Sequence, residues 1–534
     1  MQASNSFAGM DMASEQNASA TWEDVSIPNH GISGPGLWVA LLLVALPLFY
    51  CFSHDKTYND ALPVVNRYFS REPHALARLR WAVRARKILD NAHEKFGGSP
   101  YRLARGDTDV IVLSADHIPE LNKLPVEVIS SRQWHALTML GHLTGIDIVR
   151  RTSYHVKILL SRISPALPDL LEPTGQRACR ALERLLPQDP ETPWTVIDPL
   201  DTVVKCVSEV VSLVLYGPPT CDDPEMVRLC HEHTKHLFTI VFIMRWIPTF
   251  LQPYLVWLLP QKWYLESGWK VIEERIVPLV KQRMEESDEG LPTSPDMISW
   301  MVKDARSTLQ KDPWSLARLT GTLTAGGTYS TANFVVETIC DLVAHPWLLD
   351  EVREEIRLQH AKCGGVWDQA AFNGLDKLES AMKESSRLAP SAMLLYGRVV
   401  GEDYTLSDGL RLKKGQTIAV GAHHKSMDPG VFEDPEAYRG RRFYDADLAS
   451  HRAQPFRHVD PLLLTWGSGR WACPGRFFAS MTAKVLLVKL LDEYEFKFPT
   501  GKRPPNAMMH EFILFHPFGR LSVRRRKENL GIHF

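Results

Sequence analysis

One cysteine near the C-terminus lies in a bend of glycines and a proline, and this bend restricts the possible folds more than any other feature. Residues 466–475 read WGSGRWACPG, and a long apolar helical pattern begins directly after them. Glycines allow the backbone to approach a flat group closely. The following helix offers free N–H groups and a positive dipole end, which stabilise a sulfur anion. The pattern therefore predicts that Cys473 presents a thiolate to a metal in a flat cofactor.

This bend resembles the haem-binding loop of the cytochrome P-450 family. Gly469, Cys473 and Gly475 match the family's pattern. Trp466 stands where phenylalanine is usual, and Trp471 stands where arginine or histidine usually contacts a haem propionate. The resemblance implies that Cys473 is the axial ligand of haem b, because a thiolate ligand favours cleavage of bound oxygen. Taken alone, such a cysteine is more often a buried residue near a helix start.

A second motif lies inside a long helical pattern that begins at Asp312 and ends at Ala344. Residues 324–332 read TAGGTYSTA. Two glycines inside a helix cost about 1 kcal/mol each relative to alanine, so they indicate a close neighbour such as a flat cofactor. The segment resembles the family's central helix, which implies that Gly326 lies against the haem and its bound oxygen.

The family's central helix carries an acid and a threonine that deliver protons, and this sequence departs from that pattern. Anchored on Ala325 and Gly326, the motif has Thr328 in place of the acid and Tyr329 in place of the threonine. A shift by one residue puts Thr328 at the threonine position. We therefore expect Thr328, Tyr329 or Ser330, with ordered water, or a substrate hydroxyl to handle protons. The alternative is that these hydroxyls bond only to preceding helical carbonyls.

Three further residues resemble the family's structural network around the haem loop. Glu384 and Arg387 face the same side of a predicted helix that begins near Asp376. Residues 434–443 read DPEAYRGRRF and resemble the family's next motif. The resemblance implies that Arg442 completes a Glu–Arg–Arg network through bidentate hydrogen bonds. We expect this network to hold the haem loop without taking part in the chemistry.

Propionate partners are expected from two other segments. Arg398 follows a probable strand at 394–397, and the resemblance places it near the cofactor. His155 and Arg162 lie in the region that in the family covers the haem. Each of the three could contact a propionate. The alternative for each is an ordinary surface charge or a polar side chain with a protein partner.

The N-terminal part predicts a membrane anchor. No charged residue occurs from Gly31 to Ser53, and the first basic residue is Lys56. We expect a disordered lumenal segment at 1–33, a retained transmembrane helix at 34–53 and a catalytic domain at 54–534. Basic residues after the span place the catalytic domain in the cytosol at the endoplasmic reticulum. Asn17 lies in a glycosylation triplet, and the basic region expected of a cleaved signal peptide is absent from the sequence.

Residues 237–260 are strongly apolar, with Arg245 as their one charged residue apart from histidine, and they contain three prolines. The prolines and the arginine argue against a second clean membrane span. We expect two helices and a loop that form the roof of a substrate channel and dip into the membrane surface. A core helix is the alternative.

The resemblance implies a mainly α fold: a large α-rich domain and a small β-rich lobe, with the haem buried between them. It implies a monooxygenase that takes O2 and electrons from NADPH through a membrane reductase, and that oxidises a lipophilic molecule. The likeness is greatest to microsomal fungal enzymes that act on terpenoid or mixed-origin secondary metabolites. The net charge of −1 leaves no overall excess of positive charge of the kind that binds nucleic acid. The eight scattered cysteines fit free thiols in a reducing compartment.

Two other classes of function stay open at the level of sequence. The altered central helix would suit an oxygen-independent haem-thiolate isomerase or dehydratase acting on a peroxide, which needs no proton relay. A non-catalytic haem binder is the other alternative, although it leaves the anchor, the roof and the channel without a purpose. A requirement for NADPH and reductase discriminates the monooxygenase from both.

Overall fold

The computed structural model describes residues 62–69, 72–106, 108–292, 294–444 and 455–534. The lumenal segment expected at 1–33, the anchor expected at 34–53 and Asn17 lie outside these described residues. Within the described ranges, no helix is both long enough and apolar enough to cross a membrane. That finding covers the apolar run at 237–260. The seven cysteines of the same ranges are all free thiols.

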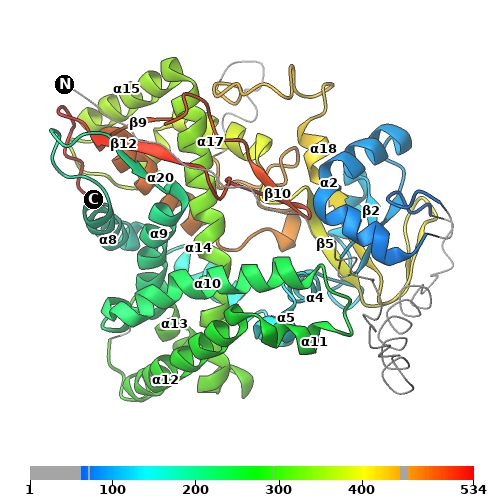
Figure 1. Cartoon of the computed structure of the whole chain (residues 1–534). Helices are drawn as coiled ribbons and strands as arrows, with labels where there is room; N and C mark the ends of the chain where they lie inside the picture. Colours follow the sequence, from blue (N-terminus) through cyan, green and yellow to red (C-terminus); the bar gives the residue numbers. More distant parts are fainter. Residues whose placement is uncertain (1–61, 70–71, 107, 293, 445–454) are drawn as a thin grey trace, which may run out of the picture. The chain divides into compact units, whose positions relative to one another are not determined.

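Helices make up most of the described chain (Figure 1). The long ones are α2 (His74–Phe96), α8 (Leu167–Leu185), α9 (Pro199–Tyr216), α10 (Pro224–Met244), α12 (Pro260–Asp288), α14 (Pro313–Ala344), α15 (Pro346–Lys362), α17 (Asp376–Leu388) and α20 (Arg476–Glu493). Shorter ones are α3 (Ile118–Leu121), α4 (Ser131–Thr138), α5 (Gly141–Thr144), α6 (Ile148–Arg151), α7 (Tyr154–Ile158), α11 (Gln252–Leu255), α13 (Met297–Asp304), α16 (Gln369–Asn373) and α18 (Ala422–Ser426).

Helix α14 is the central element of the helical part (Figure 1). It begins after Asp312, whose carboxylate caps the helix by accepting the N–H of Ser315 at 2.9 Å. It ends before Pro346, as the sequence predicted. Helices α9, α10, α12, α17 and α20 all pack against it. A glycine-containing helix therefore lies in the middle of the molecule, where packing offsets its low intrinsic helix propensity.

A small β-rich lobe contains a five-stranded sheet in the order β1-β2-β8-β5-β3. Its strands are β1 (Tyr101–Ala104), β2 (Asp109–Leu113), β3 (Ile129–Ser130), β5 (Leu394–Val400) and β8 (Thr417–Gly421). The β2–β8 pair is parallel and the other pairs are antiparallel. Val and Ile dominate the centre of β2, as expected for a buried strand. The sheet thus joins residues near 110 to residues near 400.

Smaller sheets complete the fold. Strands β4 (Thr195–Ile197), β12 (Leu521–Arg525) and β9 (Tyr494–Lys497) form one, with β12 in the middle. Strands β10 (Ala507–Met509) and β11 (Phe512–Leu514) form a hairpin, and β6 (Tyr404–Thr405) pairs with β7 (Arg411–Leu412). The predicted mainly helical fold with a small β-rich lobe is confirmed.

The apolar run at 237–260 covers the end of α10, the short α11, a 3-10 turn at Val256–Leu258 and the start of α12. Two helices and a loop were expected within this run. The run instead holds the end of α10, which starts at Pro224, and the short α11, and α12 begins only at Pro260, its last residue.

Candidate active site

The bend before α20 has a fixed backbone shape. Gly467 and Gly469 have φ values of 77° and 60°, in the left-handed region that side chains rarely adopt. A Cβ atom on Gly469 would also lie 2.6 Å from Cγ of Asn122. The N–H of Cys473 donates to the carbonyl of Trp466 at 2.7 Å, which closes the bend. The glycines are therefore required both by backbone conformation and by close packing.

The sulfur of Cys473 faces the start of α20. Burial raises the pKa of the thiol, whereas the backbone N–H groups of Gly475 and Arg476 and the Arg476 guanidinium lower it. The same guanidinium donates to the Cys473 carbonyl at 2.8 Å. In the described part of the chain, no group of three or more His, Cys, Asp or Glu residues could hold a metal ion.

Three nitrogens near this bend have no hydrogen-bond partner among the described residues. They are Nε1 of Trp471, Nε of Arg398 and Nδ1 of His155. Arg398 is 4% exposed, and its guanidinium carbon lies 5.3 Å from the centre of the Trp471 ring. Its Nη1 donates only to the adjacent carbonyl of Gly397. Each of these three nitrogens can donate to the acceptor of a bound group.

The charges around these nitrogens are mostly cationic. The pKa of Arg398 is lowered to about 10 by burial, with Arg470 adding to the effect. The pKa of His155 is lowered to about 4 by burial and by the nearby His135 and Arg132. His155 is therefore uncharged at neutral pH, and the positive charge comes from Arg398 and Arg470. Guanidinium groups suit the two carboxylates of haem. Together with Cys473, these residues fit the cofactor expected from the sequence.

Arg162, the other expected propionate partner, has a protein partner instead. Its Nε and Nη2 donate to Asp304 at 2.8 and 2.7 Å. This bidentate pair ties the end of α13 to the π-helical turn at Leu159–Ile163.

One face of α14 is open. Gly326 and Ser330 are both exposed although the helix is central, and they lie one turn apart on the same face. A Cβ atom on Gly326 would meet no atom within 4 Å. The hydroxyl of Ser330 donates back to the Gly326 carbonyl at 3.1 Å. Space for a ligand therefore lies beside these two residues.

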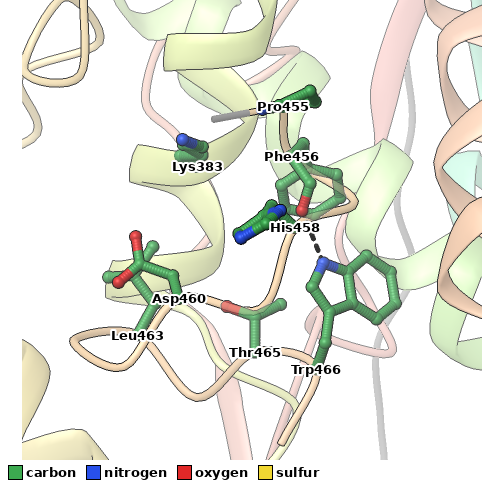
Figure 2. Close-up of a pocket in the computed structure, with 8 residues that line it drawn as sticks. All are labelled: Lys383, Pro455, Phe456, His458, Asp460, Leu463, Thr465 and Trp466. Carbon is green, nitrogen blue, oxygen red and sulfur yellow. Dashed lines mark hydrogen bonds between the residues drawn. The ribbon is translucent and has the colours of Figure 1, made fainter. Parts of the chain in front are cut away.

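The same face of α14 continues to the cysteine bend. Phe334, one turn beyond Ser330, stacks on Phe456 with ring centres 4.6 Å apart. Phe456 in turn meets Trp466 edge to face at 5.1 Å. The indole N–H of Trp466 donates to the Phe456 carbonyl at 2.6 Å, as Figure 2 shows. The open face of α14 is thus the face directed to the bend that carries Cys473.

Thr328 and Tyr329 point elsewhere. Thr328 is fully buried, and its hydroxyl donates to the Thr324 carbonyl at 2.8 Å. Thr324 is hydrogen-bonded to Tyr216 of α9 at 2.8 Å, so this face of α14 packs on α9. The Tyr329 ring lies 6.3 Å from that of Phe238 on α10. Among the three residues expected to handle protons, Ser330 alone is exposed on the open face.

Comparison with known proteins agrees with this geometry. The model of one family, described as cytochrome P450, matches residues 84–521. The chain belongs to the cytochrome P450 family. It is similar to cytochrome P450 monooxygenase AN1598 of Emericella nidulans (30% identity, covering 91% of this chain and 92% of that protein). It also resembles cytochrome P450 monooxygenase olcJ of Penicillium canescens (31%, 88% and 89%) and ent-kaurene oxidase P450-4 of Gibberella fujikuroi (29%, 87% and 92%).

This P450 is therefore a haem-thiolate monooxygenase that oxidises lipophilic molecules. Membership of the family implies haem ligated by a cysteine thiolate, and electrons that come from NADPH through a reductase. Haem, when bound, supplies the reductive cleavage of O2. Cys473 would hold it through its sulfur on one side, and the nitrogens of Arg398, Trp471 and His155 would donate to its carboxylates on the other.

Helix α17 holds the segments around the haem loop of this P450. The carboxylate of Glu384 accepts two hydrogen bonds from Arg387 at 2.8 Å and two from Nε of Arg442 at 3.0 and 3.1 Å. The side chains of Glu384 and Arg387 are fully buried, and that of Arg442 is 5% exposed. Arg387 also donates to the carbonyls of Ser426 and Pro435. The structure thus brings together the three residues of the expected network.

The link from this helix to the cysteine bend runs through hydroxyl groups. The hydroxyl of Ser386 lies 3.1 Å from that of Thr465, the residue before Trp466. A pocket beside it, lined by residues from Lys383 of α17 and from 455–466, separates the helix from the start of the bend (Figure 2). The Ser386–Thr465 contact therefore links α17, which carries Glu384 and Arg387, to the residue before the bend.

Asn122 is a site residue that no sequence motif indicated. It follows α3, and its side-chain amide donates to Ser468 in the bend at 3.1 Å. Its side-chain oxygen accepts the hydroxyl of Tyr396 on β5 at 2.7 Å. Asn122 thereby joins the haem loop to the strand that carries Arg398. A single asparagine hundreds of residues from its partners leaves no local signal.

Proposed function

We propose that this P450 oxidises a rigid polycyclic small molecule, of terpenoid or mixed biosynthetic origin, at the open face of α14. The observation that carries the proposal is an aromatic wall that runs from α14 through α10 to β11, together with the open glycine face of α14. Phe238 and Phe242 of α10 lie 6.0 Å apart, Phe238 lies 6.3 Å from Tyr329, and Phe242 lies 5.5 Å from Phe512 of β11.

All four aromatic residues of this wall are only partly buried. They come from α10, α14 and β11, which are far apart in the sequence. Aromatic side chains present large, rigid, apolar contact areas. An apolar wall with few polar groups suits a hydrocarbon skeleton with few functional groups. The names of similar proteins support this substrate class, because several of them are ent-kaurene oxidases.

We assign proton handling to Ser330. Its hydroxyl is exposed on the open face and bonds only within its own helix, to Gly326 at 3.1 Å. That bond leaves the oxygen able to accept a proton from water while its own proton passes on. Thr328 lacks such access because it is fully buried. Proton delivery by a positioned hydroxyl contributes typically about 10²–10⁴-fold in rate.

Attachment to the endoplasmic reticulum membrane is a further part of the proposal. The connection between α10 and α12 exposes Tyr254 (75% exposed) and Leu258 (76%), and the first turn of α12 exposes Trp263 (60%). Tryptophan and tyrosine favour the membrane–water interface. We propose that this loop touches the bilayer, and that an anchor at 34–53 leaves the N-terminus and Asn17 in the lumen. NADPH–cytochrome P-450 reductase in the same membrane is the proposed electron donor.

The oxygen-independent isomerase or dehydratase is not favoured. Similar proteins are named monooxygenases or oxidases. The non-catalytic haem binder is disfavoured by the open face and its aromatic wall.

A substrate screen tests the proposed function. The full chain is expressed with a P450 reductase, and a panel of terpene hydrocarbons that includes ent-kaurene is added. We expect a spectral shift of the haem with at least one member and an oxidised product that requires NADPH. A panel that gives neither shifts nor products, while acyclic fatty acids give both, would overturn the polycyclic substrate class.

A further inference from the structure

Three buried charged residues meet at the edge of the aromatic wall. Arg105 follows β1, Arg245 follows α10, and Glu511 lies in the turn between β10 and β11. Oε1 of Glu511 accepts hydrogen bonds from Nη1 of Arg105 at 2.8 Å and from Nη1 of Arg245 at 3.0 Å. The exposed fractions are 0% for Arg105 and 2% for each of the other two. One carboxylate thus joins three elements that are remote in sequence.

The carboxylate of this triad is ionised at every working pH. Burial alone raises the pKa of Glu511, but the charges of Arg245 and Arg105 outweigh it and lower the pKa to about 2. A buried ionic group is weak evidence for stability, because removing charges from water is costly. Such a group can instead select one arrangement of the elements that it joins.

The elements joined here carry the wall. Phe512 directly follows Glu511, and the guanidinium of Arg245 lies over its ring at 5.3 Å. Phe242, which meets Phe512 at 5.5 Å, precedes Arg245 by less than one helical turn. The carbonyl of Glu511 also accepts the N–H of Met393 at 2.8 Å, which ties the hairpin to the segment before β5. Glu511 therefore fixes the Phe512 side of this contact, and Arg245 fixes the Phe242 side.

Arg245 extends the connection to two further elements. Its Nη2 donates to the carbonyl of Thr138 at the end of α4 at 2.7 Å. Its own carbonyl lies so close to Gly106 that a Cβ atom there would be 2.4 Å away. The end of α10 is thus packed directly on the loop after β1, and an alanine at position 106 would not fit without movement.

We propose that Glu511 is a positioning residue for substrate: held between Arg105 and Arg245, it fixes the Phe242–Phe512 side of the aromatic wall and so determines how tightly large apolar ligands fit. This rests on the proposed function of the wall as the substrate contact. Glu511 acts through the two phenylalanines and does not touch the reacting atoms.

The test compares two ligands that bind haem iron in the purified, haem-loaded protein. Imidazole is small and reaches the iron without contact to the wall, whereas clotrimazole is bulky and aromatic and needs it. In Glu511→Gln we expect the Kd of clotrimazole to rise at least tenfold while the Kd of imidazole stays within twofold. Unchanged affinity for both ligands, or an equal loss for both, overturns the proposal.

A second variant guards against failure of Glu511→Gln to fold. Arg245→Met leaves the Arg105–Glu511 pair with balanced charge and keeps an apolar contact above Phe512. We expect the same selective loss of clotrimazole affinity, and an unchanged ratio of the two Kd values overturns the proposal.

The matched control is Glu493→Gln. Glu493 is likewise a buried carboxylate between two cations, Lys489 at 2.6 Å and Arg525 at 3.5 Å, but it lies at the far end of α20. Its neutralisation should leave the ratio of the two Kd values unchanged, and a tenfold change in that ratio contradicts the role assigned to Glu511.

The readout of all three variants is ligand binding and not turnover. Loss of haem in the parent protein would therefore refute the proposed function, whereas an unchanged ratio would refute only the role of Glu511.

Discussion

Ser330 and Gly326 lie one helical turn apart on the open face of α14, and the hydroxyl of one donates to the carbonyl of the other at 3.1 Å. The fully buried Thr328 lies between them in sequence but on the face that packs against α9. This difference in direction decides which hydroxyl can take part in chemistry. It follows from the 100° rotation per residue of an α-helix, which places i and i+4 together and i+2 almost opposite.

Replacing Cys473 with alanine should abolish the absorption band of the reduced carbon-monoxide complex near 450 nm, the hallmark of the family. The physical reason is the loss of the thiolate that the first N–H groups of α20 stabilise. Cys363→Ala is the control, because that partly buried thiol bonds only to the His360 carbonyl. A 450 nm band that survives in Cys473→Ala would show that another residue ligates the iron.

Gly326→Ala should fold well but bind ligands poorly. A Cβ atom at this position meets no protein atom within 4 Å, and alanine is about 1 kcal/mol more favourable than glycine inside a helix. Denaturant unfolding should therefore show equal or higher stability, while the affinity for clotrimazole falls. Gly321→Ala is the contrast: its Cβ would lie 2.8 Å from Trp269, so it should lose stability. A Gly326→Ala protein that is less stable and binds clotrimazole normally would show that ligands do not occupy the space beside Gly326.

Glu384→Gln should destabilise the fold by about 3–5 kcal/mol, because it leaves the guanidinium groups of Arg387 and Arg442 buried without their anion. Urea unfolding of the haem-loaded protein measures the loss. Glu354→Gln removes an ion pair of the same i,i+3 spacing, with Arg357, at the surface, and should change nothing measurable. Equal effects of the two substitutions would argue against the structural role of Glu384.

Glu337 should make stability depend on pH. Burial and the nearby Asp341 raise its pKa from 4.5 to about 7, although Arg503 opposes the rise. Between these two pH values the folded chain holds a proton that the unfolded chain has lost. The free energy of unfolding should therefore fall as pH rises through this window, relative to Glu337→Gln. Denaturant unfolding of both proteins at several pH values measures this change. A free energy of unfolding of the wild-type protein that rises with pH, relative to Glu337→Gln, would contradict the assignment.

Local sequence signals were sufficient for the elements that carry the site. Asp312, Pro313 and the proline at 346 mark both ends of α14, and the strand expected at 394–397 lies within β5. The bend before Cys473 was recognisable because its glycines and its following helix are neighbours in the chain. Each of these features is specified within a few residues, by caps, by prolines and by backbone conformation.

What could not be predicted depends on contacts between distant residues. The direction of each hydroxyl on α14 is set by which face packs on α9, through Thr324 and Tyr216, and two glycines in the motif left the register ambiguous. Glu511 and Arg245 are 266 positions apart, and Asn122 and Ser468 are 346 apart. Such pairs leave no periodic or spacing signal in a single sequence.

The central claim is that the monooxygenase reaction takes place at the open face of α14 with Ser330 as the proton-handling hydroxyl. Product formed per NADPH consumed tests it most directly, measured for Ser330→Ala and Thr328→Ala with a substrate found by the screen. We predict that both variants keep the 450 nm band, that Ser330→Ala loses about 10²-fold or more of its product per NADPH and releases hydrogen peroxide, and that Thr328→Ala stays coupled. Normal coupling in Ser330→Ala together with uncoupling in Thr328→Ala would contradict it.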